Sequence, residues 1–185
     1  MNDNDLEFFN IIEDQLSVKF TGKINILSKQ TAQFLGYLAL YEGEPLNSSY
    51  RSKLGLKAFY SIAIDEHRGV ALDFVVEPEL VEGLPRNIHY PYSVLKSKIN
   101  KILEDYKFAA KNAPPSNIKL MVNPSFIKEG EAVTSNEYDV MMVLSDYNRV
   151  GDLYKNCHLM EFEITNALVS LRKKNAIKVL ASQKE

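Results

Sequence analysis

Two adjacent prolines, Pro114 and Pro115, place the strongest local limit on how this 185-residue chain folds. Proline lacks a backbone N–H, and its ring collides with the preceding helical turn, so a helix does not continue through such a pair. Polar residues surround the pair, in the sequence Asn-Ala-Pro-Pro-Ser-Asn at 112–117. The sequence therefore predicts a linker at 112–133, with room for a short strand at 118–122, between two separately packed parts.

The first part, residues 5–111, mixes helical and strand patterns. Apolar residues at helical spacing predict helices at 5–16, 53–66 and 93–111. Asn4, three residues before Glu7, fits the capping box of the first helix.

Between these helices, the pattern changes to that of β-strands. Apolar and polar residues alternate from 18 to 26 and from 70 to 76, whereas 33–41 is apolar on both faces and is expected to be a covered central strand. Pro45 opens a third, more exposed strand that ends at Tyr50. This order of elements predicts an antiparallel meander sheet packed with helices, and thus an α+β domain.

The second part, residues 134–181, carries three helical patterns, at 136–146, 149–156 and 159–174, and then a closing strand at 177–180. The preceding residues, 123–133, contain proline and glycine and are expected to form a loop. Three short helices with tight turns and a terminal strand predict a small winged-helix-like helical domain.

Charge and cysteine content exclude several classes of protein. The 22 basic and 24 acidic residues leave a net charge of −2, which does not suit a nucleic-acid coat or a polybasic membrane binder. One cysteine forms neither an internal disulfide nor a cysteine-rich zinc site. The first residues are acidic where a secretory signal is basic, and no apolar run approaches the roughly 18 residues of a membrane-spanning helix. We expect a cytoplasmic protein without membrane insertion.

Residue patterns typical of catalysis are missing from the sequence. The glycines form no phosphate-binding loop, and His67, His89 and His158 lack the spacing of a metal-ligand pair. Cys157 precedes His158 directly, but sequence neighbours often point apart, so we interpret Cys157 as a small buried residue. We therefore expect no enzymatic activity, no cofactor and no metal ion.

A DNA-binding role for the winged-helix-like part is the alternative hypothesis. The basic cluster Arg172, Lys173 and Lys174 would contact phosphates, and a homodimer would double these contacts. However, Glu161 and Glu163 occupy the first turns of the 159–174 helix, where a recognition helix usually presents basic or amide side chains. Residues 134–185 carry seven acidic and seven basic side chains, so counterion release would be small.

The same helix has a second stripe, formed by Phe162, Asn166 and Val169, beside its main apolar face. If it is exposed, this stripe is a candidate protein-interaction surface; the other interpretation is a broad core face that covers it. The lysines of 93–111 likewise have alternative roles. They pair with the acidic residues 1–16, or they bind an acidic partner or a phosphate-bearing small ligand, the latter near Lys98 and Lys101.

Four short segments of the first part resemble the PATAN domain, a bacterial signalling module. They read Phe20-Thr-Gly22-Lys-Ile24, Gly36-Tyr-Leu38-Ala-Leu40, Glu42-Gly43-Glu44-Pro-Leu46-Asn47 and Gly55-Leu-Lys-Ala58-Phe59-Tyr. The resemblance covers about residues 5–108 and brings no active site with it. It implies a non-catalytic bacterial signalling adaptor, in motility or developmental control, that acts through protein–protein interaction. The chain has no room for the phospho-receiver domain to which such domains are often attached.

Overall fold

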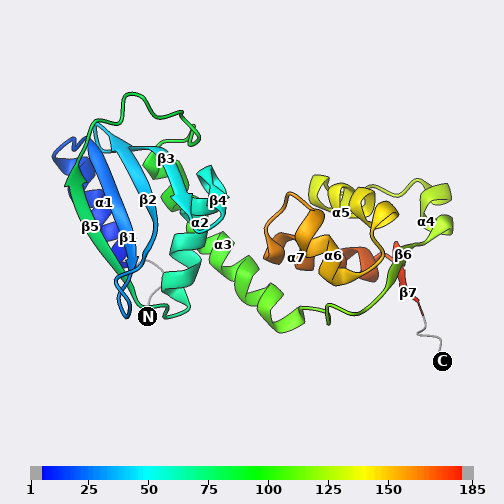
Figure 1. Ribbon diagram of the computed structural model, residues 1–185. Coiled ribbons are helices and arrows are strands. Elements are labelled where there is room, and N and C mark those ends of the chain that lie inside the picture. Colours follow the sequence, from blue (N-terminus) through cyan, green and yellow to red (C-terminus); the bar gives the residue numbers. More distant parts are fainter. Residues whose placement is uncertain (1–5, 181–185) are drawn as a thin grey trace. The chain divides into compact units, whose positions relative to one another are not determined.

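The computed structural model describes residues 6–180 and has an α+β fold (Figure 1). The chain divides into two compact units, Met1–Leu103 (unit 1) and Glu104–Glu185 (unit 2). The division falls within one long helix, α3, Tyr92–Asn112, which contributes residues to both units. Asn4, the predicted cap of the first helix, and the predicted outer limits at 5 and 181 lie outside the described residues.

Unit 1 consists of a five-stranded antiparallel sheet and its helices. In chain order these elements are α1 Glu7–Ser17, β1 Gly22–Ser28, β2 Phe34–Tyr41, β3 Glu44–Tyr50, β4 Lys53–Leu54, α2 Gly55–His67, β5 Leu72–Pro78 and the first half of α3. The strands lie side by side in the order β4-β3-β2-β1-β5. The predicted meander is thus confirmed, and β2 is its central strand.

Aromatic side chains join α1 and α2 to one face of this sheet. Phe8 of α1 stacks on Phe74 of β5, with ring centroids 5.6 Å apart, and also contacts the ring of Phe59 in α2. Ile24 and Ile26 of β1 are fully buried on the same face. The alternation of β1 follows from this packing, because only every second side chain enters the core.

The opposite face of the sheet is covered in part by residues 79–91, which form neither helix nor strand. Val81 packs against Ala39 of β2 and Leu46 of β3, and the side chain of Asn87 accepts from the Ser48 N–H and donates to the Ser48 carbonyl. The expectation of an exposed third strand is therefore wrong. The irregular segment supplies apolar and hydrogen-bonding partners that bury β3, and the sequence of β3 alone does not reveal these partners.

The amino end of α1 is capped from a distance. Leu6 is the N-cap residue and has no capping side chain, but the Glu66 carboxylate of α2 accepts from the Glu7 and Phe8 N–H groups, at 2.5 and 3.2 Å. Burial raises the pKa of Glu66, against the effect of these two bonds. A carboxylate at this position is favourable because the N–H groups of a first helical turn have no partner within the helix.

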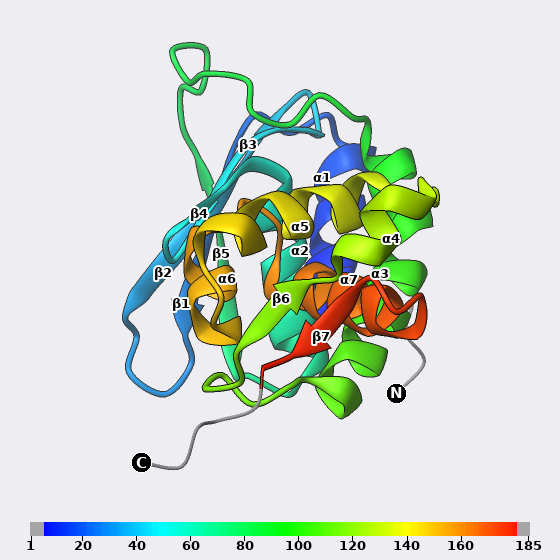
Figure 2. The same cartoon turned by 90° about the vertical axis from the view of Figure 1, so that its right-hand side faces the viewer.

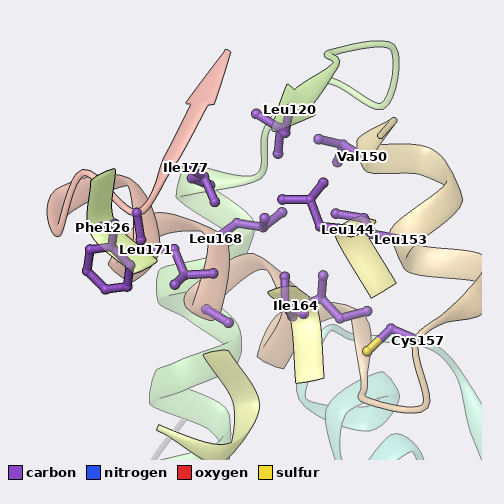
Figure 3. Close-up of a cluster of buried hydrophobic side chains, with 13 residues drawn as sticks. Leu120, Phe126, Leu144, Val150, Leu153, Cys157, Ile164, Leu168, Leu171 and Ile177 are labelled. Carbon is purple, nitrogen blue, oxygen red and sulfur yellow. The ribbon is translucent and has the colours of Figure 1, made fainter. Parts of the chain in front are cut away.

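Unit 2 contains the second half of α3, short helices and a two-stranded sheet. Its further elements are β6 Leu120–Val122, α4 Pro124–Glu129, α5 Ser135–Asp146, α6 Val150–Asn156, α7 Glu161–Lys173 and β7 Ile177–Val179. The three predicted helices and the closing strand are confirmed. Figure 3 shows their apolar side chains converging on one core, with Leu144, Leu168 and Ile177 among the buried residues.

The loop predicted for 123–133 is wrong, because this segment contains α4. Asn123 caps the helix by accepting from the Ser125 N–H, Pro124 is its first residue, and Gly130 ends it with a φ of 67°. Proline at the first position and glycine just after the last are standard helix boundaries. The same two residues that suggest a loop therefore delimit one short helix, which inserts Phe126 into the core.

The small sheet of unit 2 is assembled across the helices. β7 lies beside β6, which precedes α5, and pairs with it antiparallel (Figure 2). Lys119 also forms an isolated bridge with Arg149. Within the described residues no second strand follows β7. The element order is α5-α6-α7-β7, and the partner of the closing strand comes from the predicted linker.

Candidate functional site

Helix α7 is the element on which most candidate residues lie, and its surroundings decide their roles. Ile164, Leu168 and Leu171 enter the core of unit 2 (Figure 3). Glu163 accepts from the backbone N–H of Met160 and so caps the helix start. The helix is thereby fixed on one side by the core and at one end by its own acidic residue.

The stripe proposed as an exposed protein-interaction surface is largely covered. Phe162 is 9% exposed and meets the ring of Tyr106 edge to face, with centroids 6.4 Å apart. Asn166 donates to the backbone carbonyl of Asp105, at 3.1 Å. Both partners belong to the second half of α3, so the exposed-surface interpretation is wrong for Phe162 and Asn166. Val169 alone of this stripe faces a hollow.

That hollow, here called the α7–β7 groove, has a volume of about 420 Å³. It lies between α7, the two-stranded sheet and the residues that follow α3, and most of its lining is apolar: Pro114, Ile118, Leu120, Leu168, Val169, Ile177 and Val179. Asn112, Arg172 and Lys178 complete the lining. The groove is thus an apolar slot with two cations on its rim.

The charges of the groove are uncompensated. Arg172 and Lys178 are exposed, and neither has an ion-pair partner within residues 6–180. No acidic residue lines the groove, so its potential is positive and favours a ligand with a carboxylate or phosphate beside an apolar group. The lining supplies apolar contact and cationic hydrogen-bond donors, which are binding groups.

A second hollow, of about 500 Å³, lies between residues 116–117 and helix α6. It is polar and its charges balance, because Arg149 and Lys155 are accompanied by Asp152 and Glu161. The backbone N–H groups of Val150 and Gly151, at the start of α6, already donate to carbonyls of Ile118 and Ser116. This hollow offers no comparable selectivity for a charged ligand.

The basic cluster predicted for DNA contact does not form one patch. Arg172 lines the groove, whereas the Lys173 ammonium lies 5.9 Å from the centroid of the Phe108 ring. Lys174 donates to the carboxylate of Glu137, at 2.7 Å, and Glu137 is only 2% exposed. Of the three cations, Lys174 is therefore engaged in an ion pair within unit 2.

The Lys174–Glu137 pair also changes the pKa of the Glu137 carboxyl group. Burial alone would raise the pKa of Glu137, but hydrogen bonds from Lys174, Ser170 and the Thr134 N–H outweigh it and lower that pKa to about 2. Glu137 is the third residue of α5 and forms a capping box with Thr134. The carboxylate thus joins the start of α5 to the end of α7.

The other candidate groups take structural positions. Cys157 is buried in the core of unit 2, which confirms the interpretation from sequence, while His158 is exposed and lies 3.6 Å from Asp139. Lys96 contacts Glu13, as expected for pairing with the acidic first segment, and Lys98 stacks on the ring of Tyr90. Among the described residues, no group of three His, Cys, Asp or Glu side chains is arranged to hold a metal ion.

No helix in the described part of the chain combines the length and the apolar character needed to cross a bilayer. Comparisons of the chain with family models, with curated proteins and with solved structures found no match. The groove and its neighbours are therefore interpreted from their own geometry and chemistry.

Sequence patterns predicted only part of the groove. The pattern of α7 indicates Val169 and Arg172 as candidates but gives no sign of Lys178, Ile118 and Leu120, because pairing of β6 with β7 brings these residues together from positions far apart in the chain. One signal was available: Lys178 alternates with Ile177 and Val179, as an outward residue of a short strand does.

Proposed function

We propose that this chain is a non-catalytic bacterial signalling adaptor that binds a protein segment, with acidic and apolar side chains, in the α7–β7 groove. The observation that carries the proposal is the pairing of an apolar slot with two uncompensated cations, Arg172 and Lys178. A partner segment with a large apolar side chain flanked by carboxylates would bury the apolar side chain in the slot and place the carboxylates beside the cations of the rim.

The setting of this activity is supported by sequence. The resemblance of residues 5–108 to the PATAN domain favours a signalling pathway, in motility or development, and a binding rather than a catalytic role. The one cysteine is buried and unpaired, a pattern common in proteins of a reducing compartment such as the cytoplasm.

The test is selection of random twelve-residue peptides displayed on phage against the immobilised full chain. Selected peptides are then labelled and titrated by fluorescence anisotropy. We expect enrichment of sequences that combine Asp or Glu with large apolar residues. Substituting Arg172→Glu together with Lys178→Glu is expected to weaken their binding by about tenfold or more, because two exposed attractive pairs become repulsive.

A matched control keeps the same change in net charge away from the groove. Lys128 and Lys155 are exposed residues of unit 2 that do not line it, so Lys128→Glu with Lys155→Glu is the control pair. Equal loss in both double variants would mean that net charge, and not the groove, selects the peptides. Absence of peptides that combine acidic and large apolar residues among the selected sequences would also contradict the proposal.

DNA binding by a homodimer is the second candidate, and its support is narrower. Arg172 and Lys173 are exposed cations near the end of α7, but Tyr106 and Asp105 cover the face that would enter a groove of DNA. Anisotropy of a labelled duplex tests it at low and near-physiological salt. Binding that falls by about 10³-fold between roughly 50 and 200 mM salt would favour this candidate over the adaptor.

A further inference from the structure

Strand β5 is the long outer strand of the unit 1 sheet (Figure 1). β4, at the other border, has two residues, whereas β5 has seven, Leu72–Pro78, and pairs with β1 along its whole length. A long outer strand presents a row of backbone donors and acceptors that an extended peptide can use. The question is which groups β5 leaves available and what they would select.

The register of β1 and β5 identifies the available backbone groups. The Lys29 N–H donates to the Ala71 carbonyl, so these two residues form a hydrogen-bonded pair, and such pairs recur at every second residue of an antiparallel ladder. Asp73, Val75 and Glu77 therefore bond to β1. Leu72, Phe74 and Val76 direct their N–H and C=O groups outward, and within residues 6–180 no backbone group bonds to them from that side.

The side chains of β5 fix the strand and give its open face a charge. Leu72 is buried and Phe74 stacks on Phe8, which holds the strand in its extended form. On the opposite face, the side chains of Asp73, Val75 and Glu77 follow one another along the strand, and all three are exposed. Asp73 has no ion-pair partner among the described residues, and Glu77 accepts only a neutral bond, from the Asn25 amide at 2.6 Å. The edge is therefore an acid–apolar–acid row.

Pairing of β5 with a second copy of itself is unfavourable. In the antiparallel register that overlaps the whole strand, Val75 faces its own copy and Asp73 faces Glu77, twice by symmetry. These are non-hydrogen-bonded pairs, in which side chains approach most closely, and like charges directly opposite each other destabilise a sheet. A partner strand with lysine or arginine opposite Asp73 and Glu77 would instead place a cation beside each carboxylate.

We infer that the outer edge of β5 is a docking site for a basic extended segment of a partner protein, which adds to the sheet as a sixth strand. The outward groups of Leu72, Phe74 and Val76 bond to the backbone of this segment. Asp73 and Glu77 select cationic side chains two positions either side of an apolar residue that packs on Val75. Pro78, which has no N–H, marks the end of the usable edge.

The experiment uses the full chain and a labelled seven-residue peptide, Thr-Lys-Thr-Val-Thr-Lys-Thr, which places its two lysines and its valine on one face of a strand. The same peptide with glutamate in place of lysine is the comparison. Only the basic peptide is expected to bind. Asp73→Lys with Glu77→Lys is expected to reduce its affinity by about tenfold or more, because two cross-strand attractions become repulsions. Glu129→Lys with Glu131→Lys, at exposed positions of unit 2, makes the same change in net charge and is expected to leave binding near that of the unmodified chain.

Amide hydrogen exchange, read by NMR, distinguishes strand addition from simple charge attraction. In the free protein the Leu72, Phe74 and Val76 amides are expected to exchange faster than those of Asp73, Val75 and Glu77. Saturating basic peptide is expected to slow the first three by about tenfold or more, as new hydrogen bonds protect them. Unchanged exchange at these amides, or equal affinity loss in both double variants, would overturn the inference.

Discussion

The ion pair between Lys174 and buried Glu137 yields a quantitative prediction. The pKa of Glu137 falls from 4.5 to about 2 on folding, which corresponds to about 3 kcal/mol of the free energy of unfolding at neutral pH. Lys174→Met removes the cation but leaves the bonds from Ser170 and Thr134. We expect it to lower the free energy of unfolding of unit 2 by about 2–3 kcal/mol, because a buried carboxylate loses its counter-charge.

The assay is native-state hydrogen exchange of the amides in α5 and α7, which reports the opening of unit 2 separately from that of unit 1. Lys173→Met is the matched control, since Lys173 is exposed and its ammonium lies 5.9 Å from the centroid of the Phe108 ring; the substitution is expected to lower the free energy of unfolding by less than about 1 kcal/mol. Replacing both partners, by Glu137→Gln with Lys174→Met, is expected to recover part of the loss, because no uncompensated charge remains.

The pH dependence supplies an independent check with a definite sign. Because folding lowers the pKa of Glu137, its stabilising contribution is present above pH 4.5 and is lost as the pH falls from 4.5 through about 2. The difference between the unmodified chain and Lys174→Met is therefore expected to shrink over that range. Equal stability losses in Lys174→Met and Lys173→Met at pH 7, or a difference that grows as the pH falls, would refute the reasoning.

Three further predictions concern other parts of the chain. Asp73→Lys makes the β5 edge self-complementary, since lysine then faces Glu77 in both halves of a symmetric pair; sedimentation is expected to detect a salt-sensitive dimer that the unmodified chain lacks. Phe162→Ala is expected to lower the free energy of unfolding of unit 2 by about 3 kcal/mol in urea titration, and a loss below about 1 kcal/mol would indicate an exposed ring after all. Gly55→Ala is expected to cost about 1–3 kcal/mol in thermal unfolding, because φ is 60° and a Cβ would lie 2.7 Å from the Asn87 carbonyl oxygen; an unchanged melting temperature would contradict this.

Elements with regular periodicity were predictable from sequence. β1 and the helices α5, α6 and α7 follow the spacing of their apolar residues, because each packs one continuous face against a core. β2 is instead apolar on both faces, as suits the central strand of the sheet. The exposure of β3 was not predictable in this way. The burial of β3 depends on residues 81–88, which cover it and whose apolar residues follow neither helix nor strand spacing.

The candidate site was predicted less well for a related reason. The position of Phe162 on a second stripe of α7 is a local property, but whether it faces water depends on Tyr106, more than fifty residues earlier. The sequence around Lys174 likewise suggests a free cation, whereas Lys174 forms an ion pair with Glu137 of another helix. Contacts between residues far apart in the chain decide whether these side chains are exposed or paired, whereas patterns in a single sequence report local geometry.

Helix α3 has a consequence for how this gene can be divided by recombination. Its second half, 104–112, carries Tyr106 and Asp105, which cover Phe162 and Asn166 of α7. A crossover at the two prolines, where the chain looks most divisible, would transfer α7 without this cover and expose its aromatic ring to water. A crossover ahead of residue 104 would transfer the second unit intact, so inheritance as a separate piece requires a cut inside a helix.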